Sequence, residues 1–97
     1  MKLRLTLRAV GDLHGIARYL TARHPRAAQR VETAIRATLE TVADYPSIGR
    51  RQADASVRKA VTPEFGYLIY YEVNDALEEI AVLTIQHCRQ ERPYEDA

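Results

Sequence analysis

The side chains that could carry out acid–base or phosphate chemistry lie mostly in the second half of the chain. His87 is a histidine whose charge can change near neutral pH, and Tyr94 could act as an acid or stack on a base. The cations suited to holding a phosphate are Arg50, Arg58, Arg89 and Arg92. Cleaving RNA without a metal needs a base, an acid and such cations. With Glu64 as a further titratable group, the chain contains the residue types for this reaction.

Each of these residues also has a purely structural interpretation. His87 has the same strand parity as Leu83 and Ile85, so it could simply end a core face, and we favour that role. Arg50 follows the second predicted helix and could bind the carbonyls at its end, which we place before a role in target binding. For Arg58 both roles stay open. Tyr94 lies in a polar tail.

Other kinds of site are not indicated by the sequence. The four glycines are isolated, so there is no phosphate-binding loop, and no nucleophile motif surrounds Ser47 or Ser56. The three histidines are far apart and accompanied by one cysteine, Cys88. We therefore predict no metal and no cofactor, and no internal disulfide.

The predicted elements that must position these residues are organised around a β-hairpin between Gly66 and His87. Residues 67–73 and 80–87 are rich in Tyr, Ile and Val and are joined by a turn at Asn74-Asp75. Upstream, a strand is predicted over residues 2–6, and Thr6 can cap the first helix. His24-Pro25 ends the first helix and begins a second one, which Pro46 ends. Apolar stripes run along both helices. A connection over 45–51 leads to a predicted edge strand at 57–62. The pattern predicts an α+β fold, a small antiparallel sheet packed against an N-terminal helical hairpin, in the order β-α-α-β-β-β.

Composition predicts one domain spanning residues 1–97, soluble and in a reducing compartment, the cytoplasm, with no membrane association. The net charge of +1 hides a separation. Residues 1–60 carry twelve Lys and Arg against five acids, a balance of +7, and residues 61–97 carry two against eight, a balance of −6. Twelve of the fourteen cations are Arg. A solvated arginine-rich helix surface is favoured over a nucleic-acid patch, and charged partners are expected.

The order of several short motifs resembles a known protein family. Asp12-Leu13 lies in the first helix, and Pro46-x-x-Gly49-Arg50 follows the second. The series continues with Val57-Arg58 and residues 67–73, and it ends with the run from Ile80 to Arg89. This order is similar to that of the RelE/ParE superfamily of type II toxin–antitoxin toxins, over residues 3 to about 94. The resemblance implies the same element order and a cognate antitoxin that wraps the toxin.

The resemblance implies two possible activities. ParE-like members poison DNA gyrase, whereas RelE-like members cut messenger RNA on the ribosome. The acids of the C-terminal strands, and the presence of only two lysines, disfavour an RNA-binding face. We therefore favour a gyrase poison that binds its target through Arg50, Arg58, Arg89 and Arg92. The alternative is a metal-independent ribonuclease using His87, Arg58, Arg89 and Tyr94, and a non-toxic interaction module is a third possibility.

Overall fold

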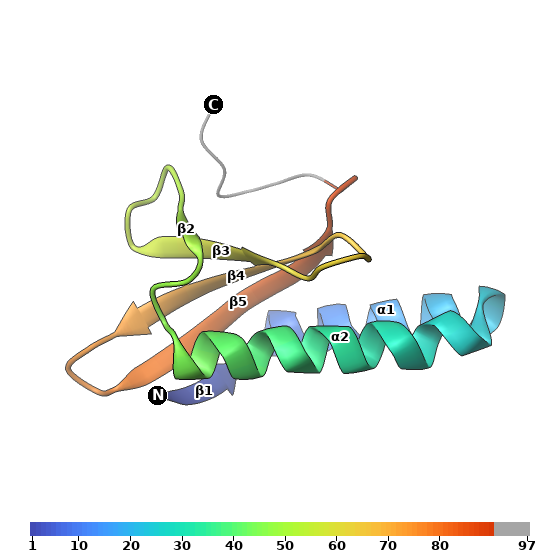
Figure 1. The fold of residues 1–97 in the computed structure, drawn as a ribbon, viewed down its shortest axis with the longest axis horizontal. Helices are drawn as coiled ribbons and strands as arrows, with labels where there is room; N and C mark the ends of the chain where they lie inside the picture. The colour runs from blue at the N-terminus through green and yellow to red at the C-terminus, as the bar shows by residue number, and fades with distance from the viewer. Residues whose placement is uncertain (91–97) are drawn as a thin grey trace.

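Two helices lie side by side across one face of a five-stranded sheet (Figure 1). The computed structural model describes residues 1–90, and their elements are β1 (Lys2–Leu5), α1 (Leu7–Arg23), α2 (Pro25–Asp44), β2 (Arg50–Arg51), β3 (Val57–Val61), β4 (Tyr67–Asn74) and β5 (Glu79–His87). The strand order is β1-β5-β4-β3-β2, with β1 parallel to β5 and every other pair antiparallel. The predicted α+β fold and its element order are confirmed.

The connection over 45–51 contains a short strand that the sequence did not predict. In β2, Arg50 lies opposite Lys59 and Arg51 opposite Arg58. The strand β3, expected at the edge, therefore has neighbours on both sides over part of its length. Two residues are too few to show an alternating pattern in the sequence. The strand β2 forms because the edge of β3 provides backbone groups with which it can hydrogen-bond.

The helix boundaries follow the predicted signals. The hydroxyl of Thr6 accepts a hydrogen bond from the Ala9 N–H at 3.1 Å, as an N-cap does, and donates to the Leu83 carbonyl at 2.9 Å. His24 ends α1, and Pro25 is the first residue of α2, where its missing N–H costs no hydrogen bond. Within residues 1–90, neither helix combines the length and apolar character needed to cross a bilayer.

The main core lies between the helices and the sheet. Ala9 and Leu20 of α1 and Val31, Ile35 and Val42 of α2 are buried, as the apolar stripes predict. The strand residues buried in the same cluster are Ala60, Tyr67, Ile69, Tyr71, Ile80, Val82 and Ile85. A smaller buried cluster on the other face consists of Val57, Leu68 and Tyr70. The alternation predicted for residues 67–73 is therefore confirmed.

A β-bulge in β5 changes the parity predicted for that strand. Tyr70 pairs with Thr84 but Tyr71 pairs with Val82, so Leu83 is an extra residue. Ile80, Val82 and Ile85 consequently belong to the helix-facing core, and Leu83 packs on the other face. The expectation that Leu83 shares a face with Ile85 and His87 is wrong, because strict alternation cannot anticipate a bulge.

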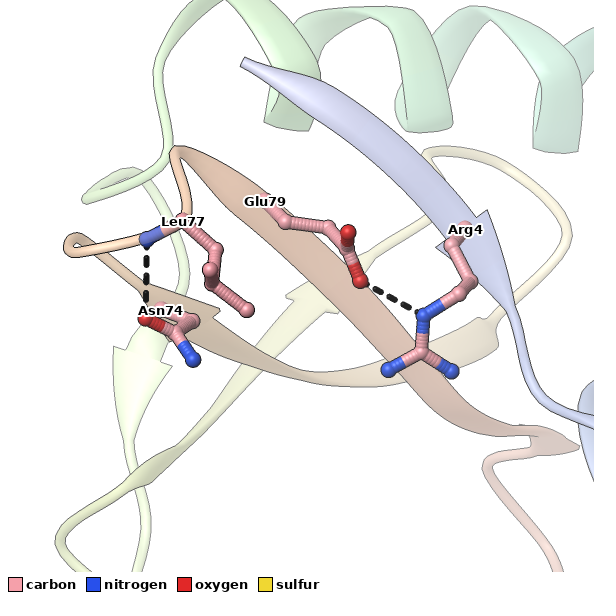
Figure 2. Close-up of polar contacts among 4 residues, drawn as sticks. All are labelled: Arg4, Asn74, Leu77 and Glu79. Carbon is pink, nitrogen blue, oxygen red and sulfur yellow. Dashed lines mark hydrogen bonds and ion pairs between the residues drawn. The ribbon is translucent and has the colours of Figure 1, made fainter.

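The β4–β5 connection lies where the turn was predicted, directly after Asn74. It spans residues 75–78, and the side chain of Asn74 accepts a hydrogen bond from the Leu77 N–H at 3.1 Å (Figure 2). Next to this turn, Arg4 of β1 forms an ion pair with Glu79 of β5 at 2.6 Å (Figure 2). The turn carries the acids Asp75 and Glu78, and Lys2 and Arg4 of β1 lie beside the start of β5.

Candidate target-binding site

The loop after α2 is held by a buried tyrosine. The Tyr71 hydroxyl donates to the Pro46 carbonyl at 2.7 Å and accepts from the Gly49 N–H at 2.8 Å. A Cβ on residue 49 would lie 2.5 Å from that hydroxyl oxygen, so only glycine fits there. Burial raises the pKa of the Tyr71 phenol, and the Gly49 N–H and the charge of Arg58 oppose this effect. The phenol therefore stays protonated near neutral pH and can donate to Pro46.

Arg58 secures the same loop from β3. Its guanidinium donates to the Gly49 carbonyl at 2.8 Å and to the Ser47 carbonyl at 3.2 Å. The contact with carbonyls beyond α2 that we expected of Arg50 is thus made by Arg58. Arg50 lies instead in β2, and both it and Arg51 are exposed. The loop arrangement presents this arginine pair at the surface.

His87 ends β5 on the face that packs against the helices. Its ring meets the ring of Tyr67 edge-on, with centroids 5.2 Å apart and planes at 82°. Its Nδ1 accepts a hydrogen bond from the Arg89 N–H at 3.2 Å, which leaves the proton of a neutral ring on Nε2. The half-buried ring therefore packs on Tyr67 and orders the chain that follows the strand.

Among the described nuclease candidates, Arg58 is separated from His87 along the sheet. Arg58 lies opposite Tyr71 and His87 opposite Tyr67, four positions apart along β4. At about 3.3 Å per residue, this offset is on the order of 13 Å along the strand. Glu64 is exposed in the β3–β4 loop, with a positive φ of 76°. Arg92 and Tyr94 lie outside the described residues.

His87 and Arg89 border a groove between α1 and the end of β5. The groove has a volume of about 680 Å³, and Tyr19, Tyr67 and Gln90 also line it. Burial raises the pKa of the Tyr67 phenol, with a smaller contribution from Tyr19. Tyr19, Tyr67 and His87 give the groove aromatic rings, and its lining includes one acid, Asp12, and one cation, Arg89. The groove therefore offers apolar and charged contacts to a partner.

Asp12 of α1 is a structural residue of this region, and its motif in the sequence does not predict that role. Its carboxylate accepts hydrogen bonds from the Thr84 hydroxyl at 2.5 Å and from the Ile85 N–H at 3.0 Å. It hydrogen-bonds the edge of β5 beyond Val82, the last residue that pairs with β1. Its early position in an amphipathic helix gives no sign of this contact in the sequence.

No group of three or more His, Cys, Asp or Glu side chains in residues 1–90 is arranged to hold a metal ion. The described residues provide exposed arginines in β2 and a groove lined in part by aromatic rings. Fold and site together define a small α+β protein with surfaces suited to binding.

The comparisons with known proteins give the family. Residues 3–92 match the family described as the ParE toxin of the type II toxin–antitoxin system parDE, and the chain belongs to this family. Y4kP of Sinorhizobium fredii, described as a toxin, is 33% identical over 92 residues, covering 95% of this chain and 93% of that protein. Toxin RelE2 of Caulobacter vibrioides is 35% identical over 82 residues, covering 84% and 89%.

Solved structures have the same fold. The chromosomal ParDE system from P. aeruginosa contains a chain that matches with a TM-score of 0.76 at 20% identity, over 90% of this chain and 95% of that one. The intact E. coli RelBE toxin–antitoxin complex contains one with a TM-score of 0.63 at 17% identity, over 94% and 98%. The predicted membership of the RelE/ParE superfamily is confirmed.

Proposed function

We propose that this ParE-family toxin inhibits growth by binding DNA gyrase, and that a cognate antitoxin holds it inactive. A poison of this kind acts through a surface and needs no acid–base pair. The arginine pair of β2, with Arg89 at the groove and Arg92 beyond the described residues, is the proposed contact with the target. Family membership supports the toxin role, and the arrangement of the arginines supports the choice of target.

The observation that carries the choice of gyrase is the position of Arg58. Its guanidinium is engaged by the carbonyls of Ser47 and Gly49, and it lies about four strand positions from His87. A ribonuclease needs its phosphate-binding cation and its base within hydrogen-bond reach of one phosphodiester. Arg58 is therefore better suited to shaping the loop that presents Arg50 than to holding a scissile phosphate.

The described residues of the toxin provide two surfaces that suit the docking of an antitoxin. A groove of about 620 Å³ runs between α1 and α2 and is lined by apolar side chains that include Leu13, Ile16 and Leu39. The outer edge of β3 extends beyond the two positions that β2 covers, and Val61 there is 53% exposed. A partner with an amphipathic helix and an extended segment would fit both, burying more than about 1,000 Å².

Two experiments test this function. Co-expression with the neighbouring reading frame should give a complex that co-purifies, and the absence of any complex would contradict the antitoxin proposal. After induction of the toxin alone, pulse labelling should show DNA synthesis stopping first while protein synthesis continues for some time. Early arrest of amino-acid incorporation, with messenger RNA cut at ribosomes, would overturn the gyrase proposal.

A ribosome-dependent ribonuclease is the second candidate. It is favoured by the similarity to the protein named Toxin RelE2 and by the groove that holds both His87 and Arg89. In that case His87, Arg58, Arg89 and Tyr94 would be the catalytic set, with messenger RNA on the ribosome as substrate. The pulse-labelling experiment separates the two candidates directly.

A further inference from the structure

The turn between the two helices is flanked by positively charged side chains, with no Asp or Glu among them. Between Asp12 and Glu32 the sequence contains four arginines and two histidines and no Asp or Glu. The arginines are Arg18, Arg23, Arg26 and Arg30, and all four are exposed. The first two lie in the last turns of α1 and the others in the first turns of α2, so they surround the turn at His24. We call residues 18–30 the hairpin tip.

Two arginines of the tip are held in place by aromatic rings. The Arg23 guanidinium lies 4.2 Å from the centroid of Tyr19, and that of Arg30 lies 5.7 Å from Phe65. Arg30 thus packs towards the β3–β4 loop rather than towards solvent beyond the turn. The acid of α1 itself, Asp12, is engaged by Thr84 and Ile85. Arg18, Arg23 and Arg26 are thus the charges best placed for a partner.

The acids Asp75, Glu78 and Glu79 lie far from the hairpin tip. Figure 1 places the helical turn and the β4–β5 turn at opposite ends of the longest axis, which extends 41 Å. The Debye length at physiological salt is about 8 Å, so the acids at residues 75–79 barely reduce the potential at the tip. Lys2 and Arg4 of β1 lie beside those acids, and Arg4 pairs with Glu79, whereas the arginines of the hairpin tip are far from all of them.

We propose that the hairpin tip binds the phosphate backbone of duplex DNA through Arg18, Arg23 and Arg26. Arginine rather than lysine suits bidentate contact with phosphate, and the three exposed cations flank one turn, which suits contact with neighbouring phosphates. The inference rests on the proposed function, since gyrase works on DNA and a poison bound to it would lie next to the duplex. It adds to that function a direct contact with the nucleic acid.

Fluorescence anisotropy with a labelled duplex of arbitrary sequence tests the proposal on the purified full-length chain. With three phosphate contacts, log K should fall with log salt with a slope of about −2.7. The double variant Arg18→Gln/Arg26→Gln should bind more weakly and reduce the magnitude of the slope by about two. The matched control is Arg4→Gln/Arg36→Gln, which also removes two charges, from exposed ion pairs away from the tip. It should bind as the wild type does.

Equal weakening by both double variants would overturn the proposal, because it would reflect net charge alone. Salt-independent binding would also overturn it, as would displacement of the duplex by polyglutamate at equal charge concentration, which would indicate an acidic protein partner. A parallel supercoiling assay with purified gyrase keeps the two proposals apart. Inhibition without duplex binding would refute the DNA contact alone, whereas duplex binding without inhibition would refute only the gyrase proposal.

Discussion

The loop that follows α2 and the hairpin tip use arginine in opposite ways. Arg58 is half-buried, and its guanidinium donates to two loop carbonyls. Arg18 and Arg26 are exposed, and the ion pairs found within residues 1–90 do not involve them. A cation whose donors are satisfied by the backbone shapes the fold, whereas a cation without such partners is available to another molecule. The surroundings of each arginine therefore decide its role.

The largest effect should come from filling the space at residue 49. Gly49→Ala would place a Cβ within 2.5 Å of the Tyr71 hydroxyl, so the loop or the buried ring must move. We expect a loss of about 1–3 kcal/mol in the free energy of unfolding, measured by urea denaturation. The control is Gly11→Ala, where nothing lies within 4 Å and the helix should gain up to about 1 kcal/mol. If the two variants were equally stable, the loop would not be tightly held.

Removing the Tyr71 hydroxyl should have a comparable or slightly smaller effect. Tyr71→Phe leaves the buried Gly49 N–H without its acceptor, at a cost of about 1–3 kcal/mol. As the pH is raised into the alkaline range, the free energy of unfolding of this variant should fall less than that of the wild type. Burial raises the pKa of the phenol, so its stabilising effect is complete below the unfolded value near 10 and is lost as pH rises through the higher folded pKa.

The measurement is the unfolding free energy of wild type and Tyr71→Phe between pH 8 and 11. The wild type should lose more over that range. The residual loss in the variant would come in part from Tyr67, whose pKa burial also raises. Tyr45→Phe, which alters an exposed ring, serves as the control. Parallel curves for the wild type and Tyr71→Phe would exclude the assigned role of this phenol.

A comparison of Arg58 with Arg50 sharpens the contrast between the two kinds of arginine. Arg58→Gln should lower stability by ~1–2 kcal/mol, because two carbonyls lose a charged donor. Arg50→Gln, on the exposed strand β2, should change stability by less than about 0.5 kcal/mol. The Arg50 variant should nevertheless reduce growth inhibition, measured as colony formation after induction. A stable Arg50 variant with full toxicity would remove β2 from the proposed target contact.

The smallest effect is expected at His87. His87→Gln removes the imidazole but keeps a side chain able to accept a hydrogen bond from the Arg89 N–H. A binding poison should keep its growth inhibition with this variant. A loss of toxicity by several orders of magnitude, with an unchanged melting temperature, would instead support general-base catalysis and the ribonuclease.

Much of the fold follows from local patterns in the chain. The stop at His24-Pro25 and the cap at Thr6 depend on backbone geometry within a few residues, and the stripes of α1 and α2 depend on helical periodicity. The order of motifs was sufficient to predict the family. These features are determined by neighbours in the sequence, so the sequence alone predicts them.

The contacts of Asp12, Gly49, Arg58 and Tyr71 were decided only in the tertiary structure. Tyr71 reaches Gly49 across 22 positions and Asp12 reaches Thr84 across 72, and no local pattern records such pairs. The bulge at Leu83 likewise depends on how β4 and β5 align, and it moves Leu83 off the face that carries Ile85. The excess of arginine could be counted in the sequence. The sequence does not tell which arginines donate to carbonyls and which stay exposed. That depends on how the chain packs, because a guanidinium forms a hydrogen bond only where folding brings an acceptor within reach.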